Sequence, residues 1–414
     1  MEQAVLTSLK VAVVGGSITG CTAAIELARL GCVVTLFERS GEELKDRGAG
    51  IGVPPSVMAA YIGRGLIGAD VPYFDAEHFV RRWRTAAAPE FGVLAWEQPA
   101  NIALLNWGGL YQNLRARVPD GVYHTGQRVV ALHQAAQGVD VALANGEVQN
   151  FDLVVCADGY ASLGRRTLFP TLELNYPGYV LWRGSLPASA MVAAAPMASG
   201  VHALGYPDGH GIFYLVPGTD ASTGRDQRLV NWGMYVPVPD LAAFMVDRDG
   251  RAHEGSLPPG AMPLATEAKL KSDARHRLPD FYADIVAASH DTYVYAIYDC
   301  EVPAYRAGRI CLAGDAGAFA RPHSGAGALK GVSDAVALRT ALASHPDLET
   351  ALTTWDREQT ASGNQMVRFG NQLGRALVLE IPDWSAMSVA EMARWFTASV
   401  TIEAELFDAW KPAS

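Results

Sequence analysis

A glycine-rich turn near the N-terminus, flanked by two short apolar segments, constrains the fold of this chain most strongly. Residues 9–14 (LKVAVV) and 33–37 (VVTLF) are β-branched runs typical of buried parallel strands. Between them, residues 22–30 (TAAIELARL) have helical spacing and end before Gly31, a natural helix stop. Strand, glycine turn, helix and strand within about thirty residues predict a βαβ unit.

The turn itself, residues 15–20 (GGSITG), resembles the turn of a dinucleotide-binding βαβ unit. Gly15 would form the tight turn, Ser17 stands where a glycine usually lets the backbone approach a pyrophosphate, and Gly20 would let helix and strand pack closely. Glu38 ends the second strand, where an acidic residue binds the hydroxyl pair of a ribose. Together these residues favour nucleotide binding over a purely structural glycine turn.

Two further motifs follow short apolar strands later in the chain. Residues 158–165 (DGYASLGR) follow the segment 151–156, and residues 314–327 (GDAGAFARPHSGAG) follow the segment 309–313. Taken singly, each can be explained as a capped helix start, with Ser162 as the N-cap of the first. Three such motifs in this order make a purely structural origin implausible. The glycines of the third would open a helix whose N-terminal end attracts negative charge.

Composition and charge exclude several classes of function. The 33 basic and 43 acidic residues give a net charge of −10, which argues against a nucleic-acid-binding chain. No apolar stretch is long enough to span a bilayer, and the N-terminus has no secretory signal pattern. The five cysteines form no CxxC pair, which is typical of reduced core residues and predicts no metal site. We therefore expect a cytoplasmic globular enzyme. The sequence leaves its oligomeric state open, with a homo-oligomer among the options.

The segments between the motifs divide into an α/β part and a mostly antiparallel part. Residues 72–110 and 176–292 are rich in Trp, Tyr, Pro and Gly and contain alternating segments typical of antiparallel strands. We predict an α/β fold in which a mostly antiparallel β-sheet domain is inserted into a Rossmann-like domain. The predicted ranges are 1–71, 111–175 and 293–345 for the Rossmann-like domain, 72–110 and 176–292 for the inserted sheet domain, and 346–414 for a helical C-terminal tail.

The three motifs together resemble the fingerprints of the single-component (group A) FAD-dependent aromatic hydroxylases, the para-hydroxybenzoate hydroxylase family. The resemblance covers nearly the whole chain and is closest to the branch of the 2,6-dihydroxypyridine 3-hydroxylases. That branch has a similar GGSxxG turn and stretches similar to residues 178–184 (GYVLWRG), 208–210 (DGH) and 321–323 (RPH). The resemblance implies that the discontinuous domain binds FAD and that the inserted sheet binds the substrate.

The resemblance also implies a set of cofactor contacts. Gly15, Ser17 and Gly20 would hold the FAD pyrophosphate, and Glu38 would hold the adenosine ribose. The remaining positions implied as contacts of FAD or NAD(P)H are Arg39, Arg47, Asp158, Arg165, Asp315, Pro322, Gly325, Ala326 and Gly327. Three positions depart from the broad family pattern, namely Trp107, Ala318 and Leu329.

The implied activity is that of a flavin-dependent monooxygenase. It would use NAD(P)H and O2 to hydroxylate an electron-rich hydroxylated aromatic or pyridinol ring through a flavin C4a-hydroperoxide. A ring hydroxyl must lose its proton near neutral pH, which the pKa of histidine suits. His210 and His323 are therefore candidates for the catalytic base that contacts the substrate ring. Tyr214 shares a strand face with His210 by even spacing and is the third candidate. Each of these residues could instead have a structural role.

The alternatives to ring hydroxylation are a non-catalytic FAD-binding sensor and another FAD- and NAD(P)H-dependent oxidoreductase. The WxWxIP stretch of flavin halogenases and the CxxxxC pair of disulfide reductases are both absent from the sequence. A plain NAD dehydrogenase would explain the first motif and leave the other two without a role. The expected partners are therefore a small aromatic or pyridine-like substrate and O2, without nucleic acid or membrane.

Overall fold

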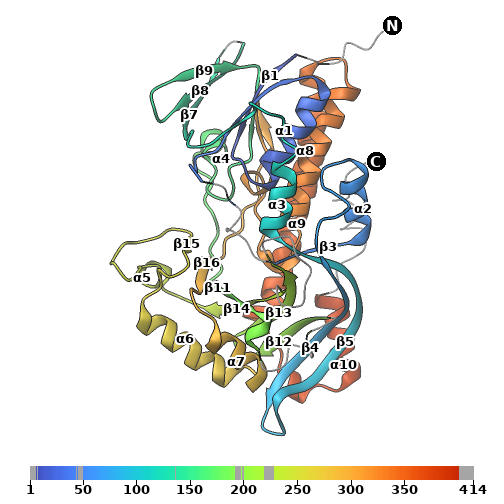
Figure 1. Ribbon diagram of the computed structural model, residues 1–414, viewed down its shortest axis with the longest axis vertical. Coiled ribbons are helices and arrows are strands. Elements are labelled where there is room, and N and C mark those ends of the chain that lie inside the picture. Colours follow the sequence, from blue (N-terminus) through green and yellow to red (C-terminus); the bar gives the residue numbers. More distant parts are fainter. Residues whose placement is uncertain are drawn as a thin grey trace.

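The computed structural model describes residues 6, 8–42, 44, 50–135, 137–191, 197, 200–218 and 228–400. A six-stranded sheet lies toward one end of the long axis and a nine-stranded sheet toward the other, with long helices running between them (Figure 1). This arrangement confirms the predicted α/β fold, in which a Rossmann-like sheet is combined with a mostly antiparallel sheet and C-terminal helices.

The six-stranded sheet contains the predicted βαβ unit. Its strand order is β17-β18-β10-β1-β2-β6, and the β1–β2, β1–β10, β10–β18 and β2–β6 pairs are parallel. Apart from the exposed Val33 at the start of β2, the β-branched runs are largely buried, as expected for strands covered on both faces. The strands are β1 (Lys10–Val14), β2 (Val33–Phe37), β6 (Tyr123–His124), β10 (Leu153–Cys156), β17 (Arg306–Ala307) and β18 (Ile310–Leu312).

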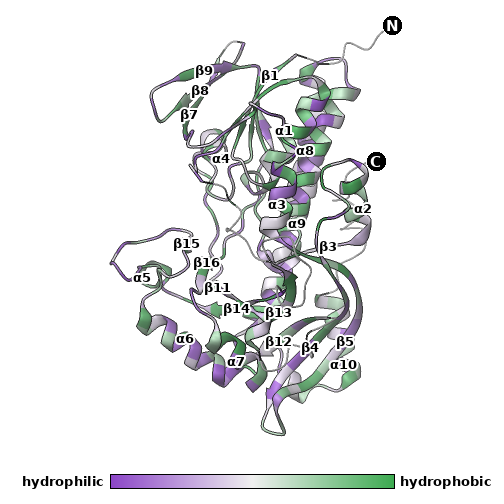
Figure 2. Ribbon diagram, viewed as in Figure 1, coloured by the Kyte–Doolittle hydropathy of each residue, from purple (hydrophilic) through white to green (hydrophobic). Residues whose placement is uncertain are grey.

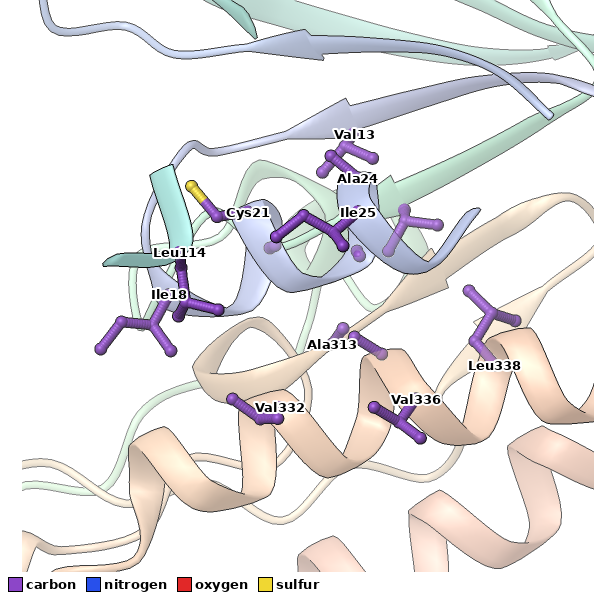
Figure 3. Close-up of a cluster of buried hydrophobic side chains, with 14 of the residues drawn as sticks. Val13, Ile18, Cys21, Ala24, Ile25, Leu114, Ala313, Val332, Val336 and Leu338 are labelled. Atoms are coloured by element: carbon purple, nitrogen blue, oxygen red, sulfur yellow. The ribbon is translucent and has the colours of Figure 1, made fainter. Parts of the chain in front are cut away.

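Helices cover one face of this sheet, and a small three-stranded sheet covers the other. Helix α1 (Ile18–Leu30) ends at Gly31, whose φ of 100° is left-handed, as the sequence predicted. Figure 3 shows the buried side chains where α1 lies along α8 (Gly327–Ser344), among them Ile25 and Val336. The opposite face packs against the sheet of β7 (Val129–Ala135), β8 (Gly138–Leu143) and β9 (Val148–Phe151).

The nine-stranded sheet is mostly antiparallel, with one parallel pair between β12 and β4. Its strand order is β15-β16-β11-β14-β13-β12-β4-β5-β3. In that order the strands are β15 (Ser256–Leu257), β16 (Tyr293–Ala296), β11 (Tyr179–Pro187), β14 (Arg228–Pro237), β13 (Gly209–Pro217), β12 (Gly200–Tyr206), β4 (Phe74–Thr85), β5 (Ala88–Asn106) and β3 (Gly50–Val53). Strands β3 and β16 lie in ranges that the sequence analysis assigned to the Rossmann-like domain. The domain ranges themselves stay a prediction.

The two faces of the nine-stranded sheet differ because side chains alternate along each strand. One face carries Val180, Trp182, Phe213 and Trp232, which form a core with α6 (Leu264–Arg277) and α7 (Asp280–Ala288). Helix α6 is the more hydrophilic of the two helices (Figure 2). The opposite face carries polar and aromatic side chains at alternating positions, namely Tyr179, Arg183, His210, Tyr214, Asn231 and Tyr235.

The C-terminal helices connect the two sheets. Helix α9 (Leu348–Gly374) packs against α8 and continues into the π-helical turn η6 (Arg375–Leu379), and α10 (Val389–Ser399) packs against β5. None of the helices in the described ranges is long and apolar enough to cross a membrane. The remaining α-helices are α2 (Pro55–Gly63), α3 (Trp107–Arg115), α4 (Leu163–Leu168) and α5 (Leu241–Phe244).

All five cysteines are buried and free of disulfides. Within the described ranges, no group of three or more His, Cys, Asp or Glu side chains is placed to hold a metal ion.

Candidate active site

A cavity of about 830 Å³ brings the three motifs together. Its wall includes part of the glycine turn, the start of the second motif and part of the third, although these segments are far apart in the sequence. Tyr293 and Tyr295 of the nine-stranded sheet also line it. The cavity therefore lies where the Rossmann-like sheet faces the inserted sheet. Among the predicted cofactor contacts, Gly15, Ser17, Glu38, Arg39, Asp158, Asp315 and Gly327 line this wall.

The glycine turn brings the backbone close to the cavity. Gly15 has a φ of 99°, and a Cβ atom there would lie 2.4 Å from the carbonyl oxygen of Ala157. A Cβ atom on Gly20 would lie 1.8 Å from the carbonyl oxygen of Gly15, so the turn requires glycine at both positions. Ser17 occupies the N-cap position of α1, and its side chain makes no capping hydrogen bond. The positive end of α1 therefore faces the cavity uncapped, which suits a pyrophosphate.

Glu38 lies beside this turn at the end of β2. Its Oε2 atom accepts a hydrogen bond from the Gly16 N–H over 2.8 Å, and its Oε1 atom accepts one from the Ser40 N–H over 2.7 Å. The residue is only 5% exposed and lines the cavity. Arg39 is exposed and also lines the cavity. Arg47 lies outside the described residues.

Asp158 of the second motif holds an unpaired acceptor at the cavity. Its Oδ2 atom accepts a hydrogen bond from the Leu163 N–H over 2.7 Å, whereas its buried Oδ1 atom has no partner among the residues that the structure describes. Burial raises the pKa of Asp158. Buried polar atoms are almost always hydrogen-bonded in native proteins, so this carboxylate fits a ligand that brings a donor.

Arg165, at the end of the second motif, joins it to the third. Its guanidinium donates to the main-chain carbonyls of Asp315, Ala316 and Gly317 over 2.9, 3.2 and 3.3 Å, and also to the carbonyl of Tyr160. Arg165 is 3% exposed, so it is not a solvated surface residue, and burial lowers its pKa. Its predicted contact with FAD or NAD(P)H stays a prediction.

Asp315 of the third motif follows strand β18 and is half-buried at the cavity wall. Burial raises its pKa to about 6, although the charges of Lys330 and Arg165 oppose this shift. Asp334 of α8 holds the turn that carries Asp315. Its Oδ2 atom accepts hydrogen bonds from the Gly314 N–H over 2.8 Å and from the Lys330 ammonium over 2.6 Å. Because Lys330 and Asp334 are both fully buried, helix α8 holds this turn firmly.

The rest of the third motif forms the N-terminal end of α8. Pro322 is exposed and opens the short helix η5 (Pro322–Ser324), which is followed by Gly325 with a left-handed φ of 66°. Ala326 occupies the N-cap position of α8, where no side chain caps the helix, and Gly327 lines the cavity. A second uncapped helix end therefore faces the same cavity as α1.

The two candidate histidines, distant in the sequence, are in contact. His210 Nε2 lies 3.3 Å from His323 Nδ1, and His323 Nε2 lies 2.9 Å from the Tyr179 hydroxyl. The ring of Tyr235 stacks on both imidazoles, at centroid distances of 4.6 and 4.1 Å. Burial and the charge of Arg81 lower the pKa of His210 to about 3, and burial lowers the pKa of His323 well below its usual value. Both rings are therefore neutral at pH 7.

Tyr214 lies on the same strand face as His210, but its hydroxyl donates to the Gly50 carbonyl over 2.8 Å. Asn231 accepts at its Oδ1 atom from the Gly50 N–H over 3.2 Å and from Arg183 over 3.4 Å. The sequence analysis did not single out Arg183 or Asn231. Arg183 lies within the GYVLWRG stretch that contributed to the family resemblance, whereas no local pattern marks Asn231.

Several further residues at the cavity wall were also not predicted as contacts. Arg128 and Arg166 add cationic side chains near the glycine turn and the second motif. Trp107, noted only as a departure from the family pattern, lines the cavity too. Two uncapped helix ends, close glycine backbone, an unpaired carboxylate oxygen and nearby arginines together fit a dinucleotide cofactor.

Comparison with known proteins agrees with this fit. The family described as "FAD binding domain" matches residues 260–370, and the family described as "FAD binding domain-like" matches residues 176–299. Residues 10–51 match "Pyridine nucleotide-disulphide oxidoreductase", and residues 97–176 match "Flavin containing amine oxidoreductase". The first of these two segments contains the βαβ unit, and the second contains the strand that leads into the second motif.

The chain is 30% identical to 2,6-dihydroxypyridine 3-monooxygenase of Paenarthrobacter nicotinovorans over 375 residues, which cover 86% of this chain and 89% of that protein. This chain belongs to the FAD-dependent aromatic hydroxylases. The hydroxylase is also similar to the solved structure of 2,6-dihydroxypyridine-3-hydroxylase from Arthrobacter nicotinovorans, with a TM-score of 0.82, 27% identity, and coverage of 90% of this chain and 93% of that one. The predicted family and enzyme class are confirmed.

A more distant structure shares the fold of the hydroxylase. Klebsiella pneumoniae HpxO, solved in complex with FAD and uric acid, is similar with a TM-score of 0.68 and 20% identity, over 97% of this chain and 92% of that one.

Proposed function

We propose that this hydroxylase uses NAD(P)H and O2 to add a hydroxyl group to an electron-rich hydroxylated ring of the phenol or pyridinol class. The observation that carries the proposal is the meeting of all three motifs at one cavity, whose wall also includes Tyr293 and Tyr295 of the inserted sheet. The similarity to a 2,6-dihydroxypyridine 3-monooxygenase over most of both chains supports the pyridinol option.

Different residues at the cavity would bind different parts of FAD. The N-terminal end of α1 at Ser17 would hold the pyrophosphate, Glu38 the adenosine ribose, and Asp158 and Asp315 donor groups of the cofactor. The uncapped end of α8 at Gly327 would stabilise negative charge on the reduced ring system. Bound FAD would supply hydride acceptance from NAD(P)H and the activation of O2.

The inserted sheet would bind the substrate ring. His210 and His323 would form its polar contact, and Tyr214 would hold the Gly50 segment against the sheet. The sequence analysis expected a histidine to remove the proton of a ring hydroxyl. The lowered pKa values of His210 and His323 make an imidazolium costly here, so the two histidines would contact a ring oxygen without removing its proton. The buried position of His210 would help to keep water from the reacting ring.

A panel of hydroxylated pyridines and phenols tests the proposal. The FAD-loaded protein should oxidise NAD(P)H rapidly only when a suitable ring is present, with O2 consumed and product mass increased by one oxygen atom. Rings without a hydroxyl, such as pyridine and benzene, are the matched controls. A yellow protein that no hydroxylated ring stimulates would contradict ring hydroxylation and favour an FAD-binding sensor. NADH and NADPH are compared in the same assay.

A further inference from the structure

A continuous chain of hydrogen bonds runs from Asp299 to His210 through the interior. Asp299 accepts from Arg321 Nε over 2.8 Å, and Arg321 Nη1 donates to the Tyr179 hydroxyl over 3.4 Å. Tyr179 then contacts His323, and His323 contacts His210, over the distances given above. At the far end, His210 Nδ1 is buried and has no hydrogen-bond partner among the described residues. This series of hydrogen bonds thus ends in a buried ring nitrogen that no other hydrogen bond of the described residues occupies.

Arg321 sets the direction of these hydrogen bonds. A guanidinium can only donate, so the Tyr179 oxygen accepts from it. The hydroxyl hydrogen of Tyr179 still needs an acceptor, and His323 Nε2 is the one acceptor that the described part of the chain offers it. Tyr179 therefore donates to His323.

The same reasoning assigns the hydrogen on each imidazole. Both rings are neutral at pH 7, so each carries one N–H and one acceptor nitrogen. Since Nε2 of His323 accepts from Tyr179, the hydrogen of His323 lies on Nδ1 and is donated to Nε2 of His210. The hydrogen of His210 then lies on Nδ1, the atom without a partner.

The reverse order of donors would leave a buried hydrogen unpaired. It would place the hydrogens on Nε2 in both rings, so that the Tyr179 oxygen accepts from Arg321 and His323 together. The hydroxyl hydrogen of Tyr179 would then point at no acceptor in the described ranges. The first order leaves one buried polar group unpaired, the Nδ1–H of His210, which an acceptor atom of a ligand can pair. The reverse order leaves two, the hydroxyl hydrogen of Tyr179 and the acceptor nitrogen Nδ1 of His210, so the first order is favoured.

We infer that Arg321, acting through Tyr179 and His323, holds His210 in the Nδ1–H form, so that this site recognises a ring by an acceptor atom such as a carbonyl oxygen or an oxyanion. The ligand class rests on the proposed function. His210 would touch the ring, while Arg321, Tyr179 and His323 are positioning residues. The substrate would therefore bind as a pyridone or as an already deprotonated phenol, and His210 would donate to its oxygen.

Two other unpaired groups on this sheet face agree with an acceptor-bearing ligand. Arg183 Nε and Asn231 Nδ2 are buried and have no hydrogen-bond partner among the described residues. Both are donors, as is Nδ1 of His210 in the inferred form. A ring that carries oxygen acceptors could pair with such groups, whereas an apolar ring would leave them all unpaired.

The hydrogen positions can be measured directly in the FAD-loaded full-length protein. The ¹⁵N shifts of labelled histidine rings distinguish Nδ1–H, Nε2–H and imidazolium forms, and the variants His210→Asn and His323→Asn assign the two signals. We expect Nδ1–H in both rings at pH 7. An Nε2–H ring or an imidazolium at either position would overturn the inference. The shifts are read from the unmodified protein, and the two variants serve only to assign the signals.

The variant Tyr179→Phe tests whether Tyr179 determines which nitrogen of His210 carries the hydrogen. Without the hydroxyl, His323 Nε2 loses its donor, so the His210 signal should move toward Nε2–H. The dissociation constant of 2-hydroxypyridine, which presents a carbonyl oxygen as its pyridone form, should rise about tenfold, the effect of losing one hydrogen bond of ordinary strength. An unchanged His210 signal and an unchanged dissociation constant would overturn the inference that Tyr179 acts on His210 through His323.

The matched control is Tyr282→Phe. Tyr282 is a second buried tyrosine that contacts a histidine, with its hydroxyl 2.6 Å from His202 Nδ1. It belongs to α7, which covers the other face of the same sheet. This variant should change neither the His210 signal nor the affinity for 2-hydroxypyridine. Equal effects of the two variants would mean that Tyr179 acts only through general stability, which would overturn its positioning role.

The inference and the proposed function can fail separately. Binding of 2-hydroxypyridine with both histidines in the Nδ1–H form, but without hydroxylation of any ring in the panel, would overturn the proposed function and support the inference. Hydroxylation of a ring by a protein whose two histidines carry Nε2–H would support the proposed function and overturn the inference. Failure of the unmodified protein to bind 2-hydroxypyridine would overturn the ligand class.

Discussion

Arg165 donates a hydrogen bond to the main-chain carbonyl of Asp315 over 2.9 Å, although 150 residues separate the two in the sequence. The same guanidinium donates to the next two carbonyls of that turn. One buried side chain therefore holds the second and third motifs against each other at the wall of the cavity.

Replacing Arg165 should affect both stability and cofactor binding. In Arg165→Ala, the carbonyls of the Asp315 turn lose their donor, at a cost of about 1–3 kcal/mol for each one that stays buried and unpaired. Urea unfolding of the FAD-free protein should show this loss, and FAD titration should show weaker binding. For the unfolding measurement the control is Arg166→Ala, which removes an exposed neighbour and should change stability by no more than about 0.5 kcal/mol. Equal stabilities of the two variants would contradict the role of Arg165.

Glu38→Ala should weaken FAD binding without unfolding the protein. The variant removes the acceptor for a ribose hydroxyl pair and also the acceptor of the Gly16 N–H, which would leave the glycine turn less ordered. A hydrogen bond to a charged group contributes about 1.5–3 kcal/mol, so the dissociation constant of FAD should rise roughly tenfold to a hundredfold. Glu42→Ala, at an exposed position nearby, is the control. An FAD affinity equal to that of the control would count against the nucleotide-binding role of Glu38.

The raised pKa of Asp315 predicts a pH dependence of stability. Burial raises this pKa from its ordinary value of 3.8 to about 6 in the folded protein. Between these values the folded chain holds a proton that the unfolded chain has released, so stability falls as pH rises, by up to about 3 kcal/mol. In Asp315→Asn this fall should disappear, and above about pH 6 the FAD-free variant should be more stable than the unmodified protein.

Urea unfolding at several pH values, with the FAD-free variant and unmodified protein compared at each, measures this effect. The buried carboxyls of Asp158 and Asp334, whose pKa values are also raised, are present in both proteins and largely cancel in the difference. A difference that does not change with pH would show that Asp315 titrates normally. The same variant should bind FAD more weakly if its carboxylate contacts the cofactor.

Substitutions of His210 should separate a hydrogen-bond donor from a base. His210→Phe keeps the ring that stacks on Tyr235 but has no donor, so product formed per NAD(P)H should fall about tenfold, with O2 diverted to hydrogen peroxide. His210→Asn has an amide N–H in place of Nδ1–H and should retain much of the coupling. Oxygen consumption and product mass measure the two outcomes. Equal losses in both variants would favour a histidine base, and His290→Asn at an exposed position is the control.

The features that could be predicted best from the sequence are those that depend on neighbouring residues. The strands, the glycine turn and the end of α1 at Gly31 follow from neighbouring residues, so they could be identified without knowledge of the whole fold. The predicted shared face of His210 and Tyr214 is present because β13 runs without interruption from Gly209 to Pro217. Their assigned roles, like the individual cofactor contacts, stay predictions.

Contacts between distant segments could not be predicted. Arg165 reaches carbonyls that another part of the chain delivers, and no pattern around it shows that it is buried. His210 and His323 were each singled out, but their contact depends on how the third motif is placed over the nine-stranded sheet. Asn231 has no local signal at all, because its importance comes from holding the backbone of Gly50, which lies 181 residues away.

The burial of the five cysteines has a consequence for the lifetime of the enzyme. Burial raises the pKa of the Cys21 and Cys311 thiols to about 12 and that of Cys32 to about 11, and it raises the pKa values of the other two as well. Oxidants attack the thiolate, and they need access to the sulfur. Thiols that stay protonated and out of contact with solvent resist sulfenic acid formation. If the proposed reaction releases hydrogen peroxide, these five positions should therefore be oxidised slowly.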